Sequence, residues 1–344
     1  MSSIIQFFHP GQEHGYDIYN SKYNCYLKDW HTIVNKNGKG IDHRRKFLLN
    51  EGYFIKNNEK HNGKLLFWSE WEPPSRVELL KQQTYCPPYG KNPEYLHIPF
   101  LPPADQLKKY QEKLFQDRHF YQNTDPFVFG DNFIYAICQQ KKKSLRVLDE
   151  GSLIIFGSRA NRRFVIDTVF VVKSKRKYHS LDDIMDMNLD IYPEIVTKLI
   201  LDKNNRINEP EGLTLYKGAT YDDPVNEMYS FIPAKVYDGK KIGFPRFYMP
   251  DDFYKTKFKN YFQNSQERYC KIFEGGMMGI KYNDNTKNEV KEFWEYIRTV
   301  VSKNHVLGYN LKMPEADESL TMQYPMIDFG EINTTKTYSN RNKC

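Results

Sequence analysis

The stretch FVFGDNFIYAICQQKKKSLRVLDEGSLIIFGSRANRRFVIDTVFVVK, residues 127–173, decides what kind of fold this chain adopts. It holds three segments rich in β-branched and aromatic residues, FIYAICQQ, SLIIFGS and RFVIDTVFVVK, which are joined by short charged turns. Runs of this length and composition are typical of strands that are buried in a sheet. They predict three adjacent antiparallel strands, and hence an α+β fold with a small mixed or antiparallel β-barrel core and peripheral helices.

Outside this stretch, the hydrophobic pattern predicts further strands and several helices. Strands are expected at 3–8, at 64–72 and in three segments after Gly212. Helical patterns occupy 104–117, 180–188, 193–202, 251–263 and 288–303, and 43–52 is expected to form one or two helical turns. The proline-rich residues 73–103 are expected to form an ordered connecting loop. Because there is no internal repeat and no low-complexity linker, we expect one domain over 1–310 and an irregular tail over 311–344.

The composition narrows the class of protein. The chain has 344 residues, 40% of them hydrophobic, with 26 Tyr and 23 Phe, so a core of real size is expected. Its five cysteines include no CxxC pair, which argues against a disulfide framework and against a structural zinc site. The N-terminus lacks a signal-peptide pattern, and no apolar run is long enough to span a membrane. We therefore expect a soluble cytoplasmic protein without a membrane partner.

Known catalytic and cofactor signatures do not occur. The chain contains no GxxxxGK[ST], no GxSxG and no HExxH, and its glycines do not form a dinucleotide-binding turn. No cofactor and no metal are expected. Two weaker metal candidates are HPGQEHG at 9–15 and the adjacent Asp222 and Asp223, for which surface turns are the simpler reading.

Positive charges gather at the turns of the opening stretch, and the chain carries a net charge of +7. Such clusters are typical of phosphate contacts, but lysines that guard the edge of a hairpin explain them equally well. Guanidinium groups in HRRKF, at 43–47, are further phosphate candidates. The residues predicted to contact a nucleic-acid backbone are Arg44, Arg45, Lys142, Arg162, Arg163, Lys175 and Arg176.

The segment FWSEWEPPS, at 67–75, places two glutamates beside two tryptophans. A carboxylate among aromatic rings can have a raised pKa and act as a general acid or bind a base edge. The simpler alternative is a strand with one buried face and solvated glutamates. Together with histidines near the N-terminus, this segment gives the catalytic candidates His14, His43, Glu70 and Glu72.

The pattern of FIYAICQ, GSLIIFGS and FVIDTVFVV resembles the core of PUA-like small β-barrels, the group with the EVE and ASCH domains, and especially nucleotide-modification-associated domains. The resemblance covers about residues 125–175 and rests on short motifs. It implies a pocket that recognises a base, often a modified or flipped one, in a DNA-modification or anti-phage context. The residues that would face this pocket are Trp68, Trp71, Phe129, Asn132, Tyr135, Cys138, Ser152, Phe156, Ser158 and Arg159.

The leading hypothesis is therefore a protein that recognises nucleic acid or a nucleotide. The alternative is an enzyme, such as a nucleotide- or NAD-processing defence effector or toxin, which would use the His and Glu residues of the N-terminal region. A third reading is an interaction or structural component of a phage or mobile element. The sequence leaves open the choice among DNA, RNA and free nucleotide, the base concerned and the oligomeric state.

Overall fold

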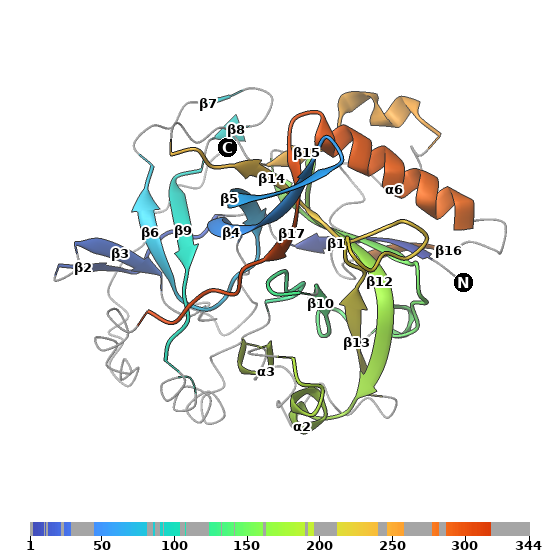
Figure 1. Ribbon diagram of the computed structural model, residues 1–344, viewed down its shortest axis with the longest axis horizontal. Coiled ribbons are helices and arrows are strands. Elements are labelled where there is room, and N and C mark those ends of the chain that lie inside the picture. Colours follow the sequence, from blue (N-terminus) through green and yellow to red (C-terminus); the bar gives the residue numbers. More distant parts are fainter. Residues whose placement is uncertain are drawn as a thin grey trace, which may run out of the picture.

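The computed structural model describes residues 3–28, 45–80, 85–103, 107, 124–189, 192–195, 212–239, 246–257, 277–281 and 287–317, with gaps of up to three residues inside these ranges. This part of the chain is an α+β structure made mostly of sheet (Figure 1).

The first sheet contains the strands of the opening stretch. Its order is β10-β13-β12-β11-β1-β16, and β15 also pairs with β12. β11 and β12 form an antiparallel hairpin, whereas β1 runs parallel to β11, so the sheet is mixed. The strands are β1 (Ser3–His9), β10 (Ile134–Tyr135), β11 (Leu153–Ala160), β12 (Arg163–Tyr178), β13 (Leu213–Gly218), β15 (Phe247–Tyr248) and β16 (Met277–Lys281).

The second sheet has the order β17-β14-β5-β4-β9-β6-β3-β2. β17 also pairs with β4, so the antiparallel strands β4, β5, β14 and β17 form a ring. β7 (Tyr85–Cys86) and β8 (Gly90–Lys91) form a separate small pair. The strands of the second sheet are β2 (Ile18–Asn20), β3 (Cys25–Lys28), β4 (Lys46–Lys56), β5 (Glu59–Ser69), β6 (Ser75–Leu79), β9 (Tyr95–Pro99), β14 (Ile232–Val236) and β17 (Val306–Leu311).

Helices are few in the described ranges. The helix α6 (Lys287–Ser302) is the longest of these, and α2 (Leu181–Met185) begins at a capping box formed by Ser180 and Asp183, as expected. The others are α3 (Tyr192–Ile195) and the 3₁₀ turns η1 (Lys143–Leu145) and η2 (Asp251–Lys255). Within these ranges, none of the helices has the length and apolar content that a bilayer crossing requires.

The two faces of the first sheet bury different cores, because side chains alternate along β1. Ile4 and Phe8 face the cluster that α6 completes with Phe293 and Ile297. Figure 1 shows α6 lying across this sheet. Ile5 and Phe7 face the other way, toward the second sheet, in a cluster rich in Phe and Tyr. α6 thus covers one face of the first sheet, in a cluster that also includes Ile55, Leu307 and Tyr309 of the ring. The other face of the first sheet packs toward the second sheet.

Several predicted elements are confirmed and others are wrong. Strands at β1, β11 and β12 and the helix α6 are found where the pattern predicts them. The helical turns expected at 43–52 are wrong, because this segment forms β4, whose residues Phe47 and Leu48 are buried in sheet pairing. The loop expected at 73–103 contains β6 and β9, and β17 was not expected.

The first predicted strand of the opening stretch is also corrected. Of FIYAICQQ, only Ile134 and Tyr135 form a strand, and it pairs with β13 rather than β11. The chain then turns, because the buried carboxylate of Asp125 accepts hydrogen bonds from the backbone N–H groups of Ala136, Ile137 and Cys138 at 2.6–3.1 Å. Most of 104–117, most of 193–202 and the end of 251–263 lie outside the described residues.

Candidate functional site

Arg45 stands at the point where the two sheets meet. It directly precedes β4, and Glu70 directly follows the paired strand β5, whose last residue lies opposite Lys46. Continuing this register places Arg45 opposite Glu70, and Arg45 Nη1 donates a 2.8 Å hydrogen bond to Glu70 Oε2. Both residues are at most 2% exposed, so this ion pair is interior.

The first sheet supplies a second carboxylate to the same guanidinium. Arg45 Nε lies 3.2 Å from Asp167 Oδ2 in β12. Asp167 is the extra residue of a β-bulge, since Phe156 pairs with Thr168 while Gly157 pairs with Ile166. A bulge re-aims a side chain, and here it points a carboxylate out of an otherwise apolar strand. Arg45 therefore joins one carboxylate from each sheet.

A tryptophan and a serine extend this arrangement. Trp68 Nε1 donates to Ser158 Oγ at 2.8 Å, and Ser158 Oγ in turn donates to Asp167 Oδ1 at 3.2 Å. The guanidinium of Arg246 lies over the Trp68 ring, 4.3 Å from its centroid, and 5.0 Å from that of Phe47. This is the geometry of a cation–π contact.

His9, at the end of β1, also lies near Glu70. Its Nε2 atom is 3.9 Å from Glu70 Oε2, and its ring stacks on Phe156 with the centroids 6.0 Å apart. We call the residues connected by these contacts around Arg45 the junction cluster. Its members are His9, Arg45, Trp68, Glu70, Ser158, Asp167 and Arg246.

The electrostatics of the junction cluster favour a proton on Asp167. Burial raises the pKa of Asp167 to about 7, although the charges of Arg45 and Arg246 and the hydrogen bond from Ser158 act in the opposite direction. A group with this pKa can give or take a proton near neutral pH. Arg246 is half-buried, whereas the other members are buried, so the cluster comes nearest to solvent at Arg246.

A further carboxyl group lies near Arg246. Glu13 accepts backbone hydrogen bonds from Glu94 at 3.0 Å and Tyr95 at 3.1 Å. Burial raises the pKa of Glu13 to about 7, and the positive charge of Arg246 lowers it in part. The HPGQEHG motif is thus divided, with His9 facing Glu70 and Glu13 facing β9. Within the described ranges, no group of three or more His, Cys, Asp and Glu side chains could hold a metal.

The catalytic candidates His14 and Glu72 are also buried, and the backbone N–H of His14 donates to the carbonyl of Arg45 at 2.9 Å. The carbonyl of His14 accepts a hydrogen bond from His97 Nε2 at 3.1 Å, so Ser75 Oγ donates to His97 Nδ1 at 2.9 Å. Burial, followed by the charge of Lys46, holds the pKa of His97 well below its usual range. Ser75 and His97 are both fully buried, which makes this pair part of the interior rather than an exposed nucleophile. The backbone N–H of Glu72 donates to Thr124 Oγ1.

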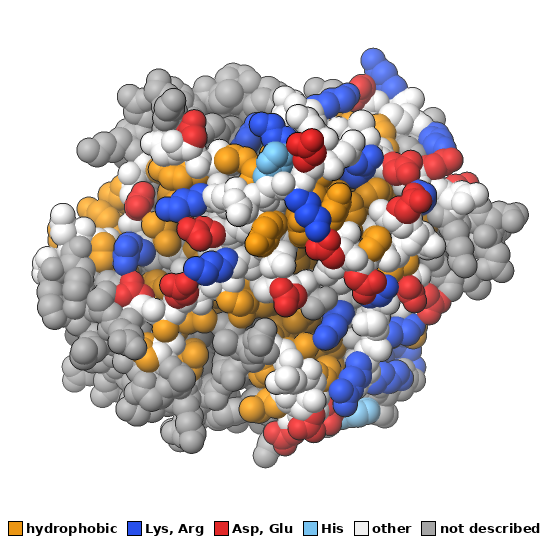
Figure 2. All heavy atoms as spheres, in the orientation of Figure 1, with side chains coloured by type: hydrophobic (Ala, Val, Ile, Leu, Met, Phe, Trp, Pro, Cys, Tyr) orange, Lys and Arg blue, Asp and Glu red, His pale blue; other side chains and the backbone are white. Residues whose placement is uncertain are grey.

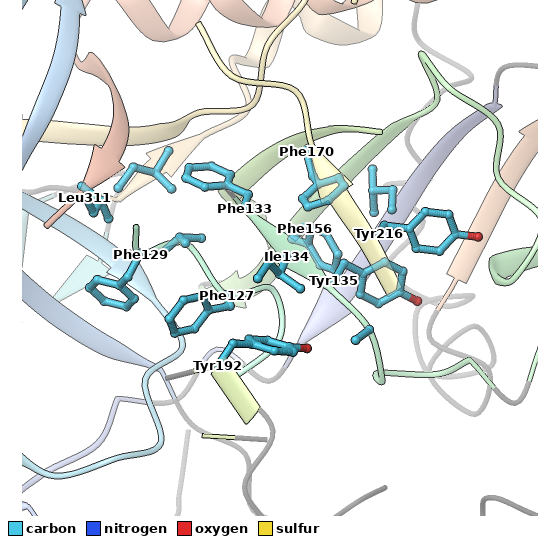
Figure 3. Close-up of a cluster of buried hydrophobic side chains, with 14 of the residues drawn as sticks. Phe127, Phe129, Phe133, Ile134, Tyr135, Phe156, Phe170, Tyr192, Tyr216 and Leu311 are labelled. Atoms are coloured by element: carbon cyan, nitrogen blue, oxygen red, sulfur yellow. The ribbon is translucent and has the colours of Figure 1, made fainter. Parts of the chain in front are cut away.

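Several of the predicted base-contacting residues lie inside the aromatic core. Figure 3 shows Phe129, Tyr135 and Phe156 among other buried rings. Phe129 contacts Trp71 with the centroids 4.8 Å apart, and Tyr135 contacts Phe156 at 5.3 Å. Ser152 is buried as well, where its Oγ accepts a hydrogen bond from the backbone N–H of Ser3.

The structure brings six of the predicted residues into one connected set. Through the stacked His9, the junction cluster continues to Phe156 and then to Tyr135. Trp71 and Phe129 contact each other in the same aromatic core as Tyr135 and Phe156. The six residues linked through the junction cluster are Arg45, Trp68, Glu70, Tyr135, Phe156 and Ser158.

Six of the predicted residues have side chains outside the described part of the chain. His43, Arg44, Asn132 and Arg162 lie outside the described residues. Arg159 and Arg163 belong to β11 and β12, but their side chains are not among the described ones.

The predicted phosphate contacts Lys175 and Arg176 are exposed at the end of β12. Together with Lys173 and Lys177 they form a stretch that we call the cationic ribbon. Lys175 Nζ donates to the carbonyl of Leu148 at 2.8 Å, which fastens the ribbon to the turn that carries Lys142 and Lys143. Figure 2 shows Lys and Arg side chains gathered at the lower right, over the end of β12. Asp149 and Asp223 pair with Lys175 and Lys173.

Sequence reasoning missed Asp167 and Arg246 and gave His9 only a minor role. One signal for Asp167 was present, because a single carboxylate interrupts the apolar run FVIDTVFVV. A charge inside such a run is costly unless another group pairs with it. No comparable signal marks Arg246, whose partners come from distant strands.

The comparisons with known proteins find no relative. No protein-family model matches the chain, and neither a curated protein nor a solved structure matches it.

Proposed function

We propose that this chain binds nucleic acid and that the cationic ribbon contacts the phosphate backbone. The observation that carries this proposal is the exposure of Lys175, Arg176 and Lys177 at one end of one strand, in a chain of net charge +7. Cations placed along a strand can follow the regular spacing of phosphates. Lys142 and Lys143, on the adjoining turn, extend the same surface. The cytoplasm is the proposed location, and Cys25 and Cys138 are free thiols.

The finer part of this proposal is the recognition of a modified or flipped base, as the resemblance to PUA-like proteins implies. Its support is Trp68, whose ring already holds a flat group, the Arg246 guanidinium. A base would stack on Trp68 in place of Arg246, with Ser158 and Asp167 beside it as hydrogen-bonding groups. The barrel part of the resemblance stays a prediction. The ring that closes is formed by β4, β5, β14 and β17, whereas β11 and β12 lie in the first sheet.

The test is fluorescence anisotropy with labelled 20-mers of single- and double-stranded DNA and RNA, each at 50 and 200 mM salt. Backbone binding predicts an affinity that falls steeply with salt on at least one of these probes. If none of the probes binds, or if binding is insensitive to salt, the proposal is wrong. Loss of binding in Trp68→Phe on a probe that carries a modified base, but not on the plain probe, would support base stacking.

Catalysis at the junction cluster is the second candidate function. The observation that favours it is the pKa of about 7 of Asp167, next to Arg45 and Glu70, because perturbed groups of this kind mark many active sites. Nucleoside triphosphates and NAD are the substrates to test. Turnover by the wild type that Asp167→Asn and Glu70→Gln abolish, with folding intact by circular dichroism, would support it. The absence of any turnover by the wild type would exclude these substrates.

A further inference from the structure

A groove of about 660 Å³ opens beside β4, where two neighbouring strands part. Along β4, the partner strand β9 pairs with Phe47 and Leu48, and the partner strand β17 begins to pair at Gly52. The residues Leu49–Glu51 lie between these two pairings and line the groove. Because β9 and β17 separate along the same edge of β4, a cleft remains between them. The volume of this groove is in the range of small-molecule sites.

The floor of the groove is one face of the second sheet. Arg76 of β6 lies opposite Ile98 of β9, and Ile98 is next to Leu49 because His97 pairs with Leu48. Glu51 follows two residues along β4 on the same face. With about 4.8 Å between strands and 3.4 Å per residue, the Cα atoms of Arg76 and Glu51 lie about 12 Å apart. A cation and an anion therefore flank an apolar floor formed by Leu49 and Ile98.

The segment 312–317 forms the other wall. The backbone N–H of Lys312 donates to the carbonyl of Glu51 at 2.8 Å, and that of Leu101 donates to the carbonyl of Glu315 at 3.0 Å. At its end, Arg76 Nη2 donates to Asp317 Oδ2 at 2.8 Å. These bonds hold the wall in place at both ends of the groove.

The charges around the groove balance. Among its lining residues, the cations Lys64, Arg76 and Lys312 face the carboxylates Glu51, Glu315 and Asp317. On the left of Figure 2, Lys and Arg alternate with Asp and Glu around hydrophobic side chains, where the 312–317 segment crosses the sheet in Figure 1. A polyanion gains little from such a surface, whereas a molecule with one charge of each sign matches it.

We propose that this groove binds a short peptide with free termini, of about three residues. Its carboxylate contacts Arg76, its ammonium contacts Glu51, and its apolar side chains lie on Leu49 and Ile98. An extended tripeptide spans roughly 10 Å, which is close to the separation of about 12 Å between the Cα atoms of Arg76 and Glu51. Arg76 has five N–H donors and is 43% exposed in its side chain, so its bond to Asp317 leaves donors for a ligand. This site is independent of the cationic ribbon.

The experiment is isothermal titration calorimetry with the tripeptide Gly-Leu-Phe in three forms: free, N-acetylated and C-amidated. Each cap removes one charged contact, so each is expected to weaken binding about tenfold. Arg76→Gln should weaken the free peptide to the level of the amide, and Glu51→Gln should weaken it to the level of the acetylated form. The matched controls are Lys56→Gln and Glu59→Gln, which remove one positive and one negative exposed charge outside the groove and should leave the affinity unchanged.

A variant that fills the groove without changing its charge tests whether the peptide binds inside the groove. Ala316 is exposed on the 312–317 wall and lines the groove, so Ala316→Trp should fill it and abolish binding while the protein stays folded. The proposal is overturned if the wild type does not bind the free peptide at millimolar concentration. It is overturned equally by three peptide forms of the same affinity, or by binding that survives Ala316→Trp.

Discussion

The guanidinium of Arg45 lies 3.2 Å from the carboxylate of Asp167, although the two residues flank or belong to strands of different sheets. Arg45 also holds Glu70 at 2.8 Å, so a single guanidinium contacts one carboxyl group from each sheet. Because all three side chains are at most 3% exposed, water cannot replace any of these partners. The relative position of the two sheets thus depends on a buried ion triad as well as on apolar packing.

Substitution of Arg45 by Met should lower the free energy of unfolding by about 3–5 kcal/mol, because it leaves the buried carboxylate of Glu70 without its cation. Urea denaturation followed by circular dichroism measures this change. Arg176→Met is the matched control, since Arg176 is exposed and its loss should cost less than about 0.5 kcal/mol. Equal effects of the two substitutions would show that the triad contributes nothing to stability.

The stability of the protein should depend on pH through Asp167. In the folded state the pKa of this group is about 7, and its ordinary value is 3.8. Between these two values the folded chain keeps a proton that the unfolded chain has lost, so the free energy of unfolding falls as pH rises from about 4 to 7. The slope is at most about 1.4 kcal/mol per pH unit for one such group.

Asp167→Asn isolates this contribution, since Glu13 and Asp125 also have pKa values raised to about 7 and stay present in both proteins. Urea titrations measure the free energy of unfolding of the wild type and the variant at pH 4.5, 5.5, 6.5 and 7.5. As pH rises, the free energy of unfolding of the wild type should fall steadily relative to that of the variant. A difference that is constant over this range would mean that Asp167 keeps its charge throughout.

Gly157→Ala should destabilise the protein by about 3 kcal/mol, because the bulge that positions Asp167 leaves no room for a side chain. A Cβ atom at this position would lie 2.3 Å from both the Phe164 ring and the carbonyl of Val165. Thermal unfolding measures the loss. Gly63→Ala, in β5, is the control, since there the nearest atom would be at an ordinary 3.7 Å.

The double substitution Arg176→Gln and Lys177→Gln should reduce the salt dependence of nucleic-acid binding. Each lost phosphate contact lowers the slope of log affinity against log salt by about 1, so the slope should fall by up to about 2. Anisotropy titrations at four salt concentrations measure it. The control pair Lys56→Gln and Lys303→Gln removes the same exposed charge elsewhere, and an equal effect there would indicate nonspecific attraction.

The strands that were predicted best from the sequence are those that are buried on both faces of the sheet. Val165, Ile166, Val169 and Val171 form a run that only a buried strand explains. The β4–β5 hairpin was missed at its turn, where Asn57 and Asn58 adopt positive φ angles of 53° and 64°. An Asn-Asn pair between two apolar runs is a hairpin signal that was available in the sequence.

The junction cluster could be predicted in part. Glu70 and Trp68 were singled out because charge and aromatic residues alternate there, and both belong to the cluster. What joins them to Asp167 could not be predicted, because the contact depends on a bulge in another sheet. The burial of Arg45 was likewise hidden, since an HRRKF sequence is equally compatible with an exposed basic turn.

The ring formed by β4, β5, β14 and β17 has a consequence for synthesis of the chain on the ribosome. Asn50 donates a hydrogen bond to the carbonyl of Lys312, 262 positions later in the sequence. Until β17 has left the exit tunnel, β4 and β14 each keep a backbone edge on which a neighbouring nascent chain can add a strand. The interval between translation of β4 and of β17 is therefore the period in which this protein most needs a chaperone.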